Sequence, residues 1–239
     1  MALRILFMGL VGSGKSYLAT LCSKMKNGLV VTFAEEVYML AEKVLQRQVN
    51  KSIQGDRELL KLIGTSWGRE GIKINEQIET VLNAEWRGAH GFQDIWLDAL
   101  VRRVNIIPPS TSLFNDDTRF FNELVTLSTK LHFLPVFVAC TESTRINRLK
   151  TRGELNDPND KAHKSEAMVN ELSEFVLNER GIPVIWNDDS ATRPNVDWVF
   201  DSTDFLSEVA NHQDYLTNKL SSTWSPDILK NFSKEVKNG

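Results

Sequence analysis

The chain has 239 residues, of which 41% are hydrophobic and 25% are charged, and its formal net charge is −3. This length and composition predict one folded domain of enzyme size and exclude a largely disordered chain. Because there is no overall excess of basic residues, the composition also argues against a nucleic-acid partner.

The cysteines and the N-terminal stretch bear on where the protein acts. Cys22 and Cys140 have neither the paired spacing of a zinc site nor the density of a secreted disulfide scaffold, which fits a reducing cytosol. The first apolar stretch is too short to cross a bilayer and leads directly into a motif, so a signal peptide is not expected. We therefore expect a cytoplasmic protein without a membrane partner.

A phosphate-binding loop follows the first predicted strand. The apolar run from Leu3 to Met8 leads into residues 9–16, Gly-Leu-Val-Gly-Ser-Gly-Lys-Ser, which match the pattern G-x-x-x-x-G-K-S. The glycines let consecutive backbone N–H groups turn toward phosphate oxygens, and a helix opening at Gly14 directs its positive end toward them. The candidate nucleotide-binding residues are Gly9, Gly12, Ser13, Gly14, Lys15, Ser16 and Tyr17.

A nucleoside triphosphate and Mg²⁺ are the expected ligands of this loop. Lys15 is expected to reach the β- and γ-phosphates of the nucleotide. Ser16 is expected to offer its hydroxyl to the Mg²⁺ ion that bridges the same two phosphates.

Strand-like runs alternate with segments of helical length over much of the chain. Beyond the first strand, strands are predicted at residues 29–33, 112–115, 133–140 and 198–200. This alternation predicts an α/β fold with a mostly parallel sheet of about five strands between two layers of helices.

Three segments depart from the alternation. Residues 34–105 carry helical periodicity, with helices expected at 35–49 and 92–104, and indicate a helical excursion from the sheet. The polar segment 152–160 is typical of a mobile loop. Residues 221–239 are polar and are expected to form a loosely packed tail.

Two further motifs narrow the function, because a phosphate loop alone is shared by ATPases, GTPases, kinases and motors. Residues 117–123 read D-T-R-F-F-N-E and residues 64–69 read G-T-S-W-G-R, with Trp96 in a later predicted helix. Together they resemble the deoxynucleoside monophosphate kinases of bacteriophages, in which the patterns D-x-R-F-x-N-E and G-T-x-x-G-R occur. The resemblance extends from Ile5 to about Val209.

Shorter matches support the resemblance along the chain. They are Phe33-Ala34, the sequence H-K-S-E at residues 163–166, and the closing strand and helix at residues 199–206. Residues 187–190, N-D-D-S, offer a second match to the closing motif, so the order of the C-terminal strands stays open.

The resemblance implies a phosphate-loop kinase that transfers the γ-phosphoryl group of ATP to a deoxynucleoside monophosphate. It implies acceptor-binding helices within residues 34–105, a lid at residues 145–170, and the host cytoplasm as location if the chain is phage-encoded. The implied acceptor-binding residues are Phe33, Ala34, Thr65, Trp67, Arg69, Trp96, Asp117, Arg119 and Glu123.

The implied roles of these residues follow from their chemistry. Arg69 and Arg119 are placed at the acceptor phosphate, where a guanidinium can bind two oxygens at once. Phe33, Trp67 and Trp96 are candidates to stack on the acceptor base, although most aromatic residues belong to the core. For Asp117, binding of a Mg²⁺-bound water, orientation of Arg119 and capping of the next helix all remain open.

A row of arginines follows the predicted strand at residues 133–140. Arg145, Arg148 and Arg152 recur at i, i+3 and i+7, so one helical face would carry all three. This face is either a solvated basic surface or, as the resemblance implies, a lid that closes over the transferring phosphoryl group and excludes water. The candidate catalytic residues are Lys15, Arg119, Arg145 and Arg148.

Other assignments remain open at this stage. His163 lies in the lid region, where a hydrogen bond and a chemical role are both open. The same loop and lid also suit another small-metabolite kinase, such as one that acts on dephospho-coenzyme A. A nucleotide-binding switch is a further alternative, although the chain has no N-K-x-D guanine motif. A homodimer is compatible with the sequence.

Overall fold

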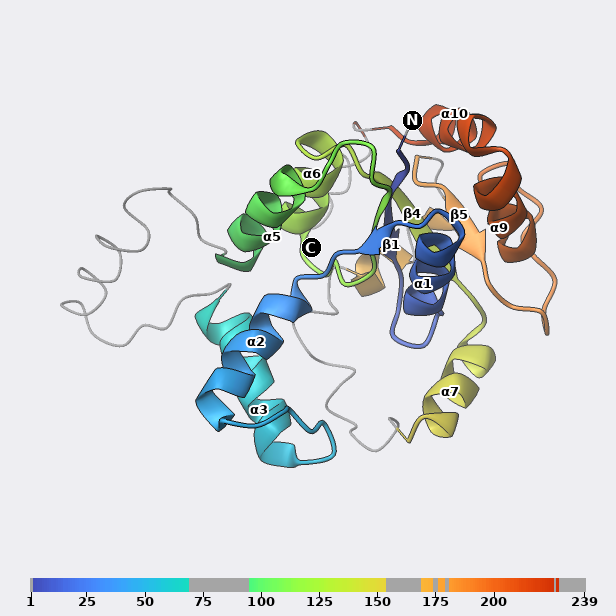
Figure 1. Ribbon diagram of the computed structural model, residues 1–239. Helices are drawn as coiled ribbons and strands as arrows, with labels where there is room; N and C mark the ends of the chain where they lie inside the picture. Colours follow the sequence, from blue (N-terminus) through green and yellow to red (C-terminus); the bar gives the residue numbers. More distant parts are fainter. Residues whose placement is uncertain are drawn as a thin grey trace. The chain divides into compact units, whose positions relative to one another are not determined.

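The computed structural model describes residues 2–68, 95–153, 169–173, 176–178, 181–225 and 227. The chain divides into two compact units, which are treated separately below. Unit 1 comprises residues 1–31 and 108–239, and unit 2 comprises residues 32–107. Figure 1 shows the elements of both.

A parallel sheet forms the centre of unit 1. The described residues give six strands in the order β2-β3-β1-β4-β5-β6, and every neighbouring pair is parallel. The strands are β1 (Arg4–Met8), β2 (Leu29–Val30), β3 (Leu113–Asn115), β4 (Leu134–Ala139), β5 (Val184–Trp186) and β6 (Val199–Asp201). The expected α/β fold with a parallel sheet is confirmed, with six strands in place of about five.

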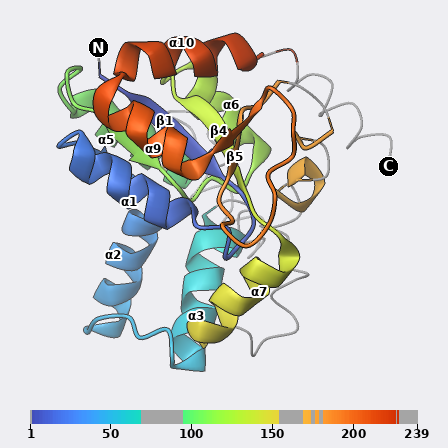
Figure 2. The ribbon, with the colours of Figure 1, turned by 90° about the vertical axis from the view of Figure 1, so that its right-hand side faces the viewer.

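Helices cover both faces of this sheet. They are α1 (Lys15–Met25), α6 (Phe121–Thr129), α7 (Glu142–Thr151), α9 (Ser202–Asn211) and α10 (Gln213–Thr223). Helices α1, α9 and α10 lie on one face and α6 on the other (Figure 1, Figure 2). In β1, Ile5 and Phe7 pack in the core with α1, α9 and α10, while Leu6 and Met8 are equally buried on the opposite face. Burial on both faces explains why residues 5–8 of this strand form an unbroken apolar run.

The C-terminal part of unit 1 is more ordered than the predicted tail. Helix α10 continues to Thr223 because Leu216, Leu220 and Thr223 are buried. The backbone N–H of Ser225 then donates to the carbonyl of Gly181 at 3.0 Å. Residues 221–223 of the expected tail therefore belong to α10, and residues 226 and 228–239 lie outside the described part of the chain.

The strand order places several loops at one edge of the sheet. The chain passes from β1 to β2 on one side of the sheet and from β3 to β4 on the other, so the connections after the neighbouring strands β1 and β3 run in opposite directions. In open parallel sheets, ligands bind outside the carboxyl ends of the strands at such a reversal. The loops after β1, β3, β4 and β5 all lie at this edge, because all four strands run in the same direction.

Unit 2 is helical where it is described. Its elements are α2 (Ala34–Leu45), α3 (Gln54–Lys61), the π-helix η1 (Leu62–Trp67) and α5 (Ile95–Ile106). The helix expected over 35–49 ends at Leu45, because Gln46 takes a left-handed conformation with φ 55°. Arg47 donates twice to Asp56, each time at 2.6 Å, and with the backbone N–H of Asn50 it lowers the pKa of Asp56 to about 2.

Within unit 2, Gly68 at the end of η1 packs closely against Trp96 in the first turn of α5. The indole N–H of Trp96 donates to the carbonyl of Ile63 at 3.2 Å, and the backbone N–H of Ile95 donates to Gly68 at 3.1 Å. A Cβ on Gly68 would collide with the Trp96 indole ring. Gly68, the second glycine of the G-T-S-W-G-R motif, is therefore required because a side chain would not fit there. Its backbone conformation is not the reason, since its φ of −78° suits any residue.

We predict that Gly68→Ala destabilises the protein by about 1–3 kcal/mol, because overpacking forces the indole out of place. Gly55→Ala is the matched control. A Cβ at Gly55 meets nothing within 4 Å, so alanine there should stabilise α3 slightly. Urea unfolding measures the change in the free energy of unfolding for each variant. Gly68→Ala should cost less in a Trp96→Leu background, and equal losses in the two backgrounds would contradict the collision.

Candidate nucleotide-binding site

The loop after β1 has the backbone conformation that its glycines allow. Gly9, Gly12 and Gly14 have φ values of 145°, 89° and 101°, which residues with side chains rarely adopt. A Cβ on Gly9 would collide with the carbonyl oxygen of Val138 in β4. The motif glycines are therefore fixed both by backbone conformation and by close approach.

Helix α1 begins directly behind this loop. Its N-cap residue is Gly14, which has no side chain to cap the helix, and the first turn carries no acidic side chain. The first N–H groups of a helix need partners outside it, and the helix dipole favours an anion there. This helix end therefore suits a phosphate group.

Two polar groups of the loop also fit a phosphate ligand. The carbonyl oxygen of Leu10 accepts from the Ser13 backbone N–H at 3.1 Å and from the Lys15 ammonium at 3.2 Å, so the lysine lies over the loop. The Ser13 hydroxyl is buried and has no hydrogen-bond partner among the described residues. A buried hydroxyl without a partner is unfavourable, and a phosphate oxygen would satisfy it. Ser16 and Tyr17 are exposed at the start of α1.

Two of the three arginines predicted on one helical face, Arg145 and Arg148, lie on α7 and bind backbone carbonyl groups of this loop. Arg145 donates to the Val11 carbonyl at 3.2 Å, and its other nitrogens bind the Glu142 carboxylate at 2.6 and 2.7 Å. Arg148 donates to the Ser13 carbonyl at 3.0 Å and more weakly to the Gly12 carbonyl at 3.5 Å. The predicted basic face thus brings Arg145 and Arg148 together at the loop. Arg152 is exposed at the end of α7.

The loop after β5 contributes residues that the sequence reasoning did not assign to the site. The Asn187 side chain donates to the Ser13 carbonyl at 2.8 Å, and its backbone carbonyl accepts from Arg148 at 2.9 Å. In the sequence, this loop is visible only as the polar run N-D-D-S at residues 187–190, which follows a short apolar run. From the sequence alone, that run is interpreted as a second match to the closing motif and not as part of the nucleotide site. The structure resolves the strand order, because β5 pairs with β4 and β6 follows it.

Asp188 fixes the geometry of this loop from within. Its carboxylate accepts hydrogen bonds from the backbone N–H and the hydroxyl of Thr141, from the hydroxyl of Thr144, and from the backbone N–H and the hydroxyl of Ser190. Burial opposes ionisation, but the hydrogen bonds from Ser190 and Thr141 outweigh it and lower the pKa of Asp188. Asp188 therefore joins the loop after β5 to the start of α7.

The loop after β3 holds Asp117 and Arg119. Asn115, which is fully buried, donates to Asp117 at 3.0 Å and to the Val31 carbonyl at 2.8 Å. Glu123 is also fully buried, and its carboxylate accepts from the backbone N–H groups of Arg119 and Phe120 at 2.8 and 3.1 Å. Glu123 thus positions the backbone beside Arg119. Asn115, the last residue of β3, pairs with Leu6 of β1, and the chain turns directly after it, because the Asn115 side chain also accepts from the Asp117 N–H and the Thr118 hydroxyl.

The acceptor residues predicted in unit 2 have mixed outcomes. Phe33 and Trp96 are only 1% and 6% exposed, so both rings are core residues and their burial does not support the base-stacking role. Ala34 begins α2 and Thr65 lies in η1. The remaining calls lie outside the described residues: the Trp67 side chain, Arg69, His163 and lid residues 154–168.

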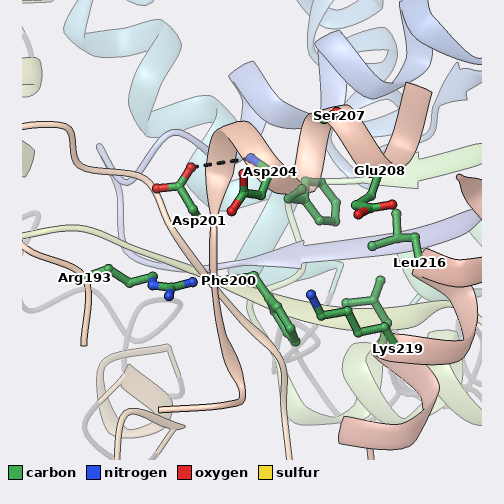
Figure 3. A pocket seen from close by; sticks show the side chains of 10 residues that line it. Arg193, Phe200, Asp201, Asp204, Ser207, Glu208, Leu216 and Lys219 are labelled. Carbon is green, nitrogen blue, oxygen red and sulfur yellow. Dashed lines mark hydrogen bonds between the residues drawn. The ribbon is translucent and has the colours of Figure 1, made fainter. Parts of the chain in front are cut away.

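Unit 1 also has a hollow formed by β6, α9 and α10, and none of its lining residues belongs to the phosphate loop (Figure 3). Two of its polar side chains make hydrogen bonds within the fold: Asp201 caps α9 by accepting from the Thr203 backbone N–H at 2.7 Å, and Arg193 donates to the Val199 carbonyl at 3.1 Å. The buried Oε2 atom of Glu208 has no hydrogen-bond partner among the described residues. The Lys219 ammonium lies 4.5 Å from the centre of the Phe200 ring. These contacts fix the C-terminal elements against one another.

Comparisons with known proteins leave the family open. The chain matches no protein-family model, and no curated protein is significantly similar to it. In the described part of the chain, no helix is long and apolar enough to cross a membrane. Within the same residues, no three His, Cys, Asp or Glu side chains are arranged to hold a metal ion.

We predict that Asp188→Asn lowers the free energy of unfolding by about 1–3 kcal/mol at pH 7, since the amide presents a donor to the Thr141 N–H. Because the native pKa of Asp188 lies below the unfolded value of about 3.9, its contribution is full above that pH and is lost below it. The difference between wild type and variant should therefore shrink as the pH falls below about 4.

Urea titrations at a series of pH values measure this difference. Asp189→Asn is the matched control, because Asp189 is the exposed neighbour in the same loop and its substitution should change stability by less than about 0.5 kcal/mol. Equal losses for the two variants would contradict the role given to Asp188.

Proposed function

We propose that this protein is a deoxynucleoside monophosphate kinase, which transfers the γ-phosphoryl group of ATP to a deoxynucleoside monophosphate and yields the diphosphate and ADP. The observation that carries the nucleotide part is the loop after β1, with three glycines at positive φ, an uncapped helix N-terminus and a buried hydroxyl without a partner. The kinase part rests on the resemblance of residues 64–69 and 117–123 to the phage enzymes.

The chemistry suits the residues at the loop. A phosphoryl transfer needs positioning and charge stabilisation more than a strong base, since the acceptor phosphate is already ionised. Lys15, now bound to the Leu10 carbonyl, would exchange that oxygen for the β- and γ-phosphates. Mg²⁺ would neutralise charge on the same phosphates, with the Ser16 hydroxyl as its protein ligand.

The acceptor side is proposed to form around Arg119. Its backbone is held by the buried Glu123, on the loop after the strand that pairs with β1. A guanidinium on a backbone held in this way can bind two oxygens of a monophosphate. Asp117 lies two residues after β3, the parallel neighbour of β1, at the carboxyl edge of the sheet, which supports a role in holding a Mg²⁺-bound water.

A coupled assay with ATP and each of the four deoxynucleoside monophosphates tests the proposal, with water as the control acceptor. Phosphorylation of at least one monophosphate above the rate of hydrolysis supports it. Hydrolysis that no monophosphate stimulates would instead indicate a nucleotide switch, and activity only with another hydroxyl acceptor would indicate a different small-metabolite kinase.

We predict that Lys15→Ala lowers kcat by at least about 100-fold, because the ammonium is the side-chain cation that the loop supplies to the transferring group. The fold should persist, as measured by circular dichroism and thermal unfolding. Lys24→Ala, at an exposed position on the same helix, should retain wild-type activity. A fully active Lys15→Ala enzyme would rule out the kinase assignment.

We also predict that Arg119→Ala raises the KM for the deoxynucleoside monophosphate by about 10- to 100-fold, while the KM for ATP changes little, because charged hydrogen bonds to the acceptor phosphate are lost. Arg102→Ala, at an exposed position, is the control. Initial rates with each substrate varied in turn separate the two constants. A rise in the KM for ATP alone would move Arg119 to the donor side.

A further inference from the structure

The Ser13 carbonyl is held by two side chains that reach it from different elements. Asn187 donates to it at 2.8 Å from the loop after β5, and Arg148 donates to it at 3.0 Å from α7. Arg148 also donates to the Asn187 backbone carbonyl at 2.9 Å, which links the two donors to each other. The three groups form a closed set of hydrogen bonds on the outer side of the phosphate loop.

Fixing this carbonyl also fixes the next N–H group. In a trans peptide the C=O and N–H bonds point to opposite sides. Since the Ser13 oxygen is turned toward Asn187 and Arg148, the Gly14 N–H is turned away from them, toward the interior of the loop. Arg145 acts in the same sense at the Val11 carbonyl, which turns the Gly12 N–H inward.

Asn187 is itself rigidly placed. Its backbone N–H donates to the Ala139 carbonyl at 2.8 Å, and the next residue, Asp188, accepts five hydrogen bonds. Its amide occupies the space where a Cβ on Gly14 would lie. Donors that are fixed before the ligand arrives need no reorganisation when it binds.

We propose that Asn187 is a positioning residue for nucleotide binding: with Arg148 it holds the Ser13 carbonyl outward, so that the Gly14 N–H faces the phosphates. The inference rests on the proposed binding of ATP by this loop. It gives Arg148 a role through the loop backbone, in addition to the direct phosphoryl contact expected from the sequence.

The test compares Asn187→Ala with wild type by calorimetric titration of two probes, MgATP and magnesium tripolyphosphate. Tripolyphosphate has the phosphates of ATP without the base and sugar. We expect both probes to bind about 5- to 10-fold more weakly to the variant, by the same factor, because one hydrogen bond that orients the loop is lost. Binding of the deoxynucleoside monophosphate should not change. Asn147→Ala, an exposed asparagine on α7, is the matched control.

Asn187→Asp provides a second variant of nearly the same shape, and urea unfolding of each variant confirms that it is folded. The carboxylate cannot donate to the Ser13 carbonyl, so both probes should bind still more weakly than to Asn187→Ala. The expected order of affinity is wild type, then the alanine variant, then the aspartate variant.

Four results bear on the inference in distinct ways. Unchanged affinity of Asn187→Ala for both probes would overturn it, and so would a loss for MgATP with none for tripolyphosphate, which would indicate a contact with the base or sugar. If wild type binds both probes but phosphorylates no monophosphate, the kinase proposal fails while the positioning role is still measured. If wild type binds neither probe, both fail.

Discussion

The buried carboxylate of Asp188 is the constraint on which the outer side of the phosphate loop depends. It ties the loop after β5 to Thr141 and Thr144 at the start of α7. Helix α7 carries Arg145 and Arg148, and the residue before Asp188 is Asn187, so the donors to the phosphate loop all leave from elements that this carboxylate joins. Burial of the charge raises the pKa of Asp188 by itself, but the hydrogen bonds from Ser190 and Thr141 outweigh it and hold this pKa below its ordinary value.

The long, fully buried strands could be predicted from the sequence, whereas the shortest ones could not. Strands β1 and β4 have five and six residues and are buried on both faces, so each appears in sequence as an apolar run. Strand β5 has only three residues, Val184–Trp186, directly after Pro183. A run of that length carries no periodicity, and the polar residues behind it resemble a helix start, so it could not be recognised without its neighbours in the sheet.

The site divides in a similar way between local and distant contacts. The phosphate loop could be predicted because its glycines and lysine act within eight residues, and the two arginines because helical spacing places them on one face. Asn187 lies 174 positions from its partner Ser13, and no local pattern encodes that pairing. For Phe33 and Trp96, the motif match predicts ligand contact, and the structure shows that both side chains are buried.

The two arginines at the loop differ in what they contribute electrostatically. The charge of Arg145 is compensated by Glu142, so its effect on the loop is chiefly geometric, through the Val11 carbonyl. Arg148 donates to carbonyl oxygens, which carry no net charge, and its positive charge therefore remains beside Ser13 and Gly14. A phosphate bound at the start of α1 would experience that charge together with the helix dipole. Through the Ser13 carbonyl, Arg148 would thus turn the Gly14 N–H toward such an anion. Its charge would also add to the electrostatic potential that attracts the anion.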